Sequence, residues 1–158
     1  EGTTGIQAND LIGRKIAREG GATLKSVIGL IHGTLADVQK QSGADFAAIA
    51  SALGRGVAAV TEAGTYIATH YGQDVRTVAV GAVPFLKLMG IVCGGWQMAR
   101  AALVAQEKIA GGDTDPFYPA KIATARFFAD HVMAAAPGLA QVVTHGGASA
   151  LALHEEMF

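Results

Sequence analysis

The first residues of the chain carry the side chains best suited to chemistry. The carboxylate of Glu1 is followed by Gly2, by the hydroxyls of Thr3 and Thr4, and by Gly5. Apolar residues then recur at helical spacing, so this segment stands just ahead of a helix. Thr3 or Thr4 can cap that helix, and a helix N-terminus also favours a nearby anion. From the residues alone, capping is the preferred role for the segment.

Two other patterns that could bind ligands have a simpler explanation. The glycines of Gly54-Arg55-Gly56 resemble a dinucleotide-binding motif, but they lie inside a strongly periodic helix and not after a strand. We therefore expect them to serve close helix packing. The histidines are not spaced three or four residues apart and only one cysteine is present, so the spacing predicts no zinc site. We expect surface or helix-end positions for all five: His32, His70, His131, His145 and His154.

The remaining candidate residues are also expected to be structural. Asp113 and Asp115 could bind calcium, but Pro116 interrupts the ligand series of an EF-hand loop, so helix capping is preferred. Cys93 lies in the most apolar predicted helix, where a buried and unreactive thiol is expected.

The composition limits the classes of protein to which the chain can belong. Of its 158 residues, 51% are hydrophobic and 16% are charged, which excludes a disordered chain and indicates a large buried apolar surface. The net charge is −1, so no basic field attracts nucleic acid. The single cysteine leaves no intrachain disulfide and fits a reducing cytoplasm. No signal peptide is expected at the start.

The apolar periodicity is helical almost throughout and predicts an all-α fold, an antiparallel bundle of long helices. Glycines mark the helix ends, and Gly20-Gly21 is the expected joint between the first helix and a four-helix unit. Asp45 is expected to cap the third helix. Pro84 should bend the fourth helix or start a separate one, and Pro137-Gly138 should break or kink the fifth. The expected helices span about residues 6–18, 22–41, 45–71, 74–110 and 118–136, and a short helical piece is expected to follow to residue 144.

One stretch is long and apolar enough to need a test against a membrane span. Residues 78–96 are about as long as a bilayer span. Lys87 lies near the centre of this stretch, where a lysine costs about 2.5–3.5 kcal/mol on insertion scales. We therefore expect a central helix enclosed by its neighbours, and no membrane span.

Two separated stretches resemble acyl-CoA dehydrogenases. Residues 1–7 are similar to the Glu-Gly-Thr region of that family. Residues 5–15 and 121–132, and the ending at 155–158, resemble the branch with an added C-terminal helical domain, which includes 3-methylmercaptopropionyl-CoA dehydrogenases. The resemblance divides the chain into residues 1–20, the end of the dehydrogenase C-terminal helical domain, and residues 21–158, the added four-helix-type domain.

The resemblance implies an FAD-dependent oxidoreductase of fatty-acid metabolism that converts acyl-CoA to a trans-2-enoyl-CoA. Glu1 matches the base that removes the α-proton, and Gly2 matches a position where backbone lies against the substrate. Thr3 and Gly5 match positions near the ADP part of FAD, although many members carry a larger polar residue in place of Gly5. Electron-transferring flavoprotein is the family's usual acceptor. The isolated 158-residue chain is expected to be inactive and to lack bound FAD.

Two alternatives to an enzyme fragment remain open at this point. The chain could be a self-contained helical interaction or oligomerisation module, with Glu1 merely near a helix cap. It could also be a membrane-associated bundle, against which Lys87 argues. For the enzyme fragment, the apolar content of the added domain indicates an interdomain or intersubunit surface, so we expect homo-oligomers and self-association of the isolated chain.

Overall fold

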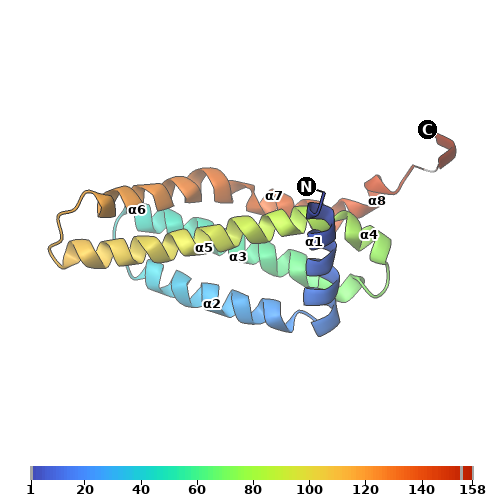
Figure 1. Cartoon of the computed structure of the whole chain (residues 1–158), viewed down its shortest axis with the longest axis horizontal. Coiled ribbons are helices and arrows are strands. Elements are labelled where there is room, and N and C mark those ends of the chain that lie inside the picture. Colours follow the sequence, from blue (N-terminus) through green and yellow to red (C-terminus); the bar gives the residue numbers. More distant parts are fainter. Residues whose placement is uncertain (1, 154, 158) are drawn as a thin grey trace.

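The structure is a computed structural model that describes residues 2–153 and 155–157. All regular structure within this part of the chain is helical, which confirms the predicted all-α class. Figure 1 shows long helices lying lengthwise beside one another and alternating in direction, with α1 crossing one end of the bundle. The lengthwise helices are α2 (Ala22–Gln39), α3 (Ala44–His70), α5 (Ala82–Ala110) and α6 (Phe117–Phe127).

Shorter elements extend or connect these helices. The crossing helix α1 continues through a π-helical turn and a 3₁₀ turn up to the glycine pair, and α6 continues in the same way into α7. The remaining bounds are α1 (Thr4–Asp10), with π and 3₁₀ turns at Leu11–Ile16 and Ala17–Glu19; α4 (Val75–Val80); π and 3₁₀ turns at Phe128–Val132 and Met133–Ala135; α7 (Ala136–His145); α8 (Gly147–Ala150); and a 3₁₀ turn at Glu155–Met157.

The core is apolar and centred on α3, which packs against α2, α5, α6 and α7. No polar or charged side chain among the described residues is buried. The apolar stripe that makes the α3 sequence strongly periodic faces inward: Phe46, Ile49, Leu53, Val57, Val60, Gly64 and Ile67 are buried, and Tyr71 is half-buried. Alternating steps of three and four residues hold one face toward the core over the length of this helix.

Helix α5 is enclosed only in part, contrary to the expectation from its apolar sequence. Phe85, Leu88 and Val92 are completely buried against the bundle. Lys87 and Val104, in contrast, lie on a stripe that is exposed to solvent. The stripe is exposed because α2, α3 and α6 cover only the other flanks of α5.

The predicted cap of the third helix needs correction, and the fourth predicted helix divides in two, in agreement with the alternative that a separate helix starts at Pro84. The third helix begins at Ala44 after Gly43, whose φ of +103° suits glycine, so Asp45 lies in the first turn and does not cap it. The fourth predicted helix is interrupted at Gly81, where an added Cβ would lie 3.1 Å from the Val143 Cα. Pro84 then falls in the first turn of α5, where its missing N–H costs no helical hydrogen bond.

The last predicted long helix is interrupted earlier than expected. Pro137 lies in the first turn of α7, where proline is tolerated, and the irregular turns lie before it at Phe128–Val132 and Met133–Ala135. Arg126 and Asp130 form an ion pair in this region, with 2.6 Å between Nε and Oδ2. Arg126 also contacts Asp45 at 3.3 Å, and this contact links α6 to the start of α3.

Two helices, α3 and α5, are long and apolar enough to cross a membrane by length and composition alone. Half of the most apolar window of α3 and 33% of that of α5 are buried inside the bundle. Core helices of water-soluble domains pass the same test, so this finding is weak support for a membrane span.

Candidate active-site segment

The segment with the predicted site residues leads into α1 at one end of the bundle (Figure 1). Glu1, the predicted base, lies outside the described residues. Gly2 is exposed and has a φ of +50°, and Thr3 is the N-cap residue of α1, with its carbonyl accepting the Gln7 amide at 2.9 Å. Gly5 is exposed in the first turn, and an added Cβ there would meet no atom within 4 Å. Gly2, Thr3 and Gly5 therefore share one exposed segment.

This exposed segment is attached to a firmly packed helix. Ala8 and Ile12 are completely buried and Ile16 is 2% exposed. Because these residues are four apart, they lie on one face, and that face packs on the bundle, where α1 contacts α5. The residues ahead of them are consequently held at a fixed place on the bundle end.

A close contact between Gly13 and Tyr71 lies at the same place. An added Cβ on Gly13 would be 2.5 Å from Tyr71 Oη and 3.1 Å from Cζ, so only glycine lets the phenol approach so closely. Gly13 belongs to the π-helical turn Leu11–Ile16, a rare geometry that is often found near functional sites. Neither the contact nor the π-helical turn was predicted from the sequence. A glycine in the middle of an apolar-periodic helix was the only sequence signal for them.

The predicted joint at Gly20-Gly21 is a tight left-handed turn. Their φ values are +58° and +80°, and the Gly21 amide donates to the Ile16 carbonyl at 2.9 Å. The Thr23 hydroxyl donates to the Glu19 carboxylate across the turn. Leu24 then packs closely against α3 at Gly64. These contacts fix the direction in which the first helix leaves α2.

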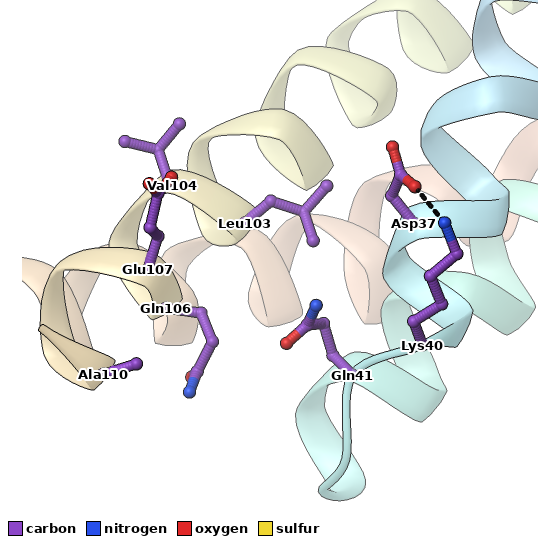
Figure 2. Close-up of a pocket in the computed structure, with 8 residues that line it drawn as sticks. All are labelled: Asp37, Lys40, Gln41, Leu103, Val104, Gln106, Glu107 and Ala110. Carbon is purple, nitrogen blue, oxygen red and sulfur yellow. Dashed lines mark hydrogen bonds and ion pairs between the residues drawn. The ribbon is translucent and has the colours of Figure 1, made fainter.

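An open cleft of about 480 Å³ lies between the C-terminal parts of α2 and α5, at the far end of the bundle from α1. Figure 2 shows the side chains that line it. Asp37 and Lys40 form a 2.7 Å ion pair on its α2 side, while Leu103 and Gln106 come from α5. The carboxylate is thus already paired with a neighbour on its own helix. The geometry of this cleft does not support a reactive centre.

The resolved pKa shifts have local structural causes. The Thr77 hydroxyl donates to Asp74 at 2.6 Å and its amide donates at 3.1 Å, and these bonds lower the pKa of Asp74, the N-cap of α4. Burial raises the pKa of the half-buried Cys93 thiol. The hydrogen bond to Asp130 raises the pKa of Arg126. Each shift thus follows from capping, packing or pairing.

The packing role expected for Gly54-Arg55-Gly56 is confirmed, whereas the N-cap residue of α6 is Pro116 and not Asp113 or Asp115. Gly54-Arg55-Gly56 lies inside α3, and an added Cβ on Gly56 would be 2.8 Å from Met133 Cε, as close packing requires. The Phe117 amide donates to Asp115 Oδ1 at 2.9 Å at the start of α6.

Metal-binding side chains do not gather in the described ranges. No group of three or more His, Cys, Asp or Glu residues there could hold an ion. Four of the histidines, His32, His70, His131 and His145, are exposed, and His154 lies outside these ranges.

Comparison with known families assigns the helical bundle to the C-terminal domains of acyl-CoA dehydrogenases. A family model described as "Acetyl-CoA dehydrogenase C-terminal like" matches residues 27–154, and the chain belongs to this family.

Two curated relatives agree with this assignment. The chain is 41% identical over 133 residues to a 3-methylmercaptopropionyl-CoA dehydrogenase of Ruegeria pomeroyi, and 36% identical over 141 residues to the broad-specificity linear acyl-CoA dehydrogenase FadE5 of Mycobacterium tuberculosis. Each match covers 84% of this chain, but only 22% and 23% of the respective relative. The chain thus spans about a fifth of the length of these relatives.

Proposed function

We propose that this chain is the C-terminal part of an FAD-dependent acyl-CoA dehydrogenase that oxidises acyl-CoA to trans-2-enoyl-CoA. The observation that carries the proposal is an exposed Gly2–Thr3–Gly5 segment, next in sequence to Glu1, on a helix anchored to a domain of the acyl-CoA dehydrogenase type. The names of the two relatives support the same substrate class.

In the proposed reaction, Glu1 acts as the base at the α-carbon of the thioester. Its carboxylate takes the α-proton while the β C–H bond breaks and the α–β double bond forms. FAD, when bound, supplies the acceptor for the hydride that leaves the β-carbon. The α-proton is weakly acidic, so the complete site must exclude water from Glu1 and polarise the thioester carbonyl. Gly2 leaves room for the substrate beside the backbone, because it has no side chain.

Thr3 and Gly5 are the residues of this chain that would hold the ADP part of FAD. Both are exposed, and the space around the Gly5 Cα admits another group. Amides at the start of a helix suit a phosphate. Because only this short edge of a flavin site is present, we expect the purified 158-residue chain to show no flavin absorbance. Stoichiometric FAD in that preparation would contradict the proposal.

The division of the chain and its partners are part of the same proposal. Residues 1–20 would complete the helical domain that precedes them, and residues 21–158 would form the added domain. The left-handed Gly20-Gly21 turn supports a boundary there. Electron-transferring flavoprotein would accept the electrons. The protein would act in the cytoplasm and would have neither a nucleic-acid partner nor a membrane span. Large exposed apolar side chains support self-association: Ile6, Leu30, Val104, Phe117 and Phe127 are each more than half exposed.

The decisive experiment replaces Glu1 in the polypeptide encoded by the complete reading frame. General-base catalysis contributes about 10²–10⁴-fold, so Glu1→Gln should lower kcat by at least about 100-fold with flavin content unchanged. Glu107→Gln is the matched control, because Glu107 is exposed at the far end of the bundle, and it should keep full turnover. Full turnover by Glu1→Gln would refute the assignment of the base.

A second candidate function is a helical interaction or oligomerisation module without a catalytic role. The exposed apolar residues, among them Leu30 and Phe127, favour it. The reading frame upstream of Glu1 discriminates the two: dehydrogenase sequence there supports the enzyme, and a start codon just before Glu1 supports the module. Both predict self-association of the isolated chain, and a monodisperse monomer by sedimentation at high concentration would count against that expectation.

A further inference from the structure

We propose that the contact between Gly13 and Tyr71 is a positioning contact that fixes the orientation of the segment carrying Glu1, Gly2, Thr3 and Gly5. The inference rests on the proposed function for its catalytic meaning, while the contact itself can be tested separately. It also assigns a role to the added domain, because Tyr71 ends α3 in that domain. The added domain would then set the geometry of the catalytic loop.

The first support is that the close approach of Tyr71 requires a glycine at position 13. Gly13 lies on the crossing helix, and an added Cβ would be 2.5 Å from Tyr71 Oη, 3.1 Å from Cζ and 3.6 Å from Cε2. Tyr71 cannot retreat freely, because it is half-buried and its amide donates to the Ile67 carbonyl at 3.0 Å. Ile67 is itself completely buried in the core. The phenol therefore limits how closely the backbone of the crossing helix can approach the end of α3.

The second support is the local shape of the crossing helix. Its geometry changes from α to π at Leu11, so the helix is widened in the turn that contains Gly13. Ala8, Ile12 and Ile16 attach the helix along one buried stripe. A single apolar stripe fixes the depth of a helix better than its tilt. The Gly13–Tyr71 contact lies beside the stripe and supplies a second fixed point.

The third support is the length of helix between Gly13 and the site segment, which converts a small tilt into a large displacement. Gly13 lies eight residues after Gly5, which is about 12 Å of helix at roughly 1.5 Å per residue. A tilt of about 5° at Gly13 would thus move the site segment by about 1 Å. A misplacement of that size, caused far from the chemistry, can cost about 100-fold in rate. The Asp10–Arg14 ion pair, at 3.0 Å, runs along the same helix and does not resist such a tilt.

A structural test uses the 158-residue chain and amide hydrogen exchange of residues 8–16. Gly13→Ala should speed exchange there by about tenfold, because the new Cβ forces the helix away from Tyr71. Tyr71→Leu removes Oη, Cζ and Cε2, so Gly13→Ala/Tyr71→Leu should exchange more slowly than Gly13→Ala alone. Gly29→Ala, at an α2 position where an added Cβ meets no atom within 4 Å, is the control and should not change exchange in this segment. Unchanged exchange in Gly13→Ala would overturn the contact.

A kinetic test uses the polypeptide of the complete reading frame with its FAD. Gly13→Ala should lower kcat by about 10–100-fold, with KM for acyl-CoA within about twofold and flavin content unchanged. The double variant Gly13→Ala/Tyr71→Leu should recover at least about threefold of kcat, a rescue that simple loss of stability would not produce. Should Gly13→Ala fail to fold, Tyr71→Leu alone should still lower kcat at constant KM.

The outcomes distinguish a failure of the proposed function from a failure of the positioning role alone. An inactive wild-type polypeptide with normal FAD would refute the proposed function and the positioning role with it. An active wild type whose kcat is unaffected by both Gly13→Ala and Tyr71→Leu would overturn the positioning role alone. Equal losses of kcat in Gly13→Ala and in the double variant would do the same.

Discussion

The contact of Met133 with two glycines gives the sharpest prediction about stability. Its thioether lies between Gly56 on α3 and Gly95 on α5, and its side chain is only 4% exposed. An added Cβ on Gly95 would be 2.2 Å from Sδ, 2.8 Å from Cε and 3.1 Å from Cγ. Cε is also near the Gly56 position, at 2.8 Å from a Cβ built there, so Met133 cannot move toward α3 to make room.

The expected effect of Gly95→Ala follows from two opposing contributions. Replacing glycine by alanine inside a helix stabilises it by about 1 kcal/mol. Inserting a methyl group into a filled core costs about 1–3 kcal/mol. We expect the free energy of unfolding to fall by about 1 kcal/mol, which corresponds to a Tm lower by roughly 2–4 °C for a chain of this size. Gly29→Ala on α2, with open space around it, should raise that free energy by about 0.5–1 kcal/mol.

Urea unfolding followed by far-UV circular dichroism measures both variants against the same wild type. The reasoning depends on the opposite signs of Gly95→Ala and Gly29→Ala. A Gly95→Ala chain as stable as Gly29→Ala would show that Met133 repacks without cost, and would refute the view that the two glycines are required for its place.

The remaining predictions concern three local contacts. Trp96→Phe removes the 2.7 Å hydrogen bond from Nε1 to Thr34 Oγ1 and should lower the free energy of unfolding by about 0.5–1.5 kcal/mol. In a Thr34→Val background the same substitution should lower it by less, and a double-mutant cycle in urea measures the difference. Asp74 has a pKa held below its usual 3.8 by Thr77, so its stabilising effect is present above that pH and lost as the pH falls through the folded pKa. The stability difference between wild type and Asp74→Ala should accordingly shrink in acid unfolding experiments below about pH 3.8 and stay constant between pH 5 and 7. Cys93, whose pKa is raised by burial, should react with iodoacetamide more slowly than a free thiol at pH 8, and urea should abolish the difference.

The helical class and the core stripes follow from the sequence because apolar spacing is a local property. The stripe of α3 from Phe46 to Ile67 needed only its own steps of three and four residues to be placed correctly. The exposure of Lys87 and Val104 on α5 could not be predicted from apolar spacing. Which flank of an apolar helix stays open depends on where its neighbours pack, and apolar spacing does not give that arrangement.

The helix ends show a similar division. Glycines marked the general regions of the breaks, but Gly81 and not Pro84 interrupts the fourth predicted helix. The deciding contact is between Gly81 and the backbone of Val143, which is far away in sequence. Likewise, Asp45 was expected as a cap from its type, whereas Gly43 precedes the first turn and Asp45 accepts from Arg126 of α6. Long-range contacts thus decided the positions that local propensity left open.

In the candidate site, too, local sequence predicts some features and long-range contacts decide the others. For this reason Tyr71, the most informative residue for the site, is far from it in sequence. The chemistry of Glu1, Gly2, Thr3 and Gly5 came from residue types and from resemblance, and the three of them that the structure describes, Gly2, Thr3 and Gly5, are exposed. Their orientation depends on how the crossing helix is seated, which involves the stripe through Ile12 and the approach of Tyr71 to Gly13. A catalytic loop with exposed, small residues cannot hold its own geometry, because it buries too little surface to resist displacement. The rigidity of the proposed site has to come from the packed helix behind it, so variants in that helix and at Tyr71 test whether the domain proposed for residues 21–158 affects catalysis.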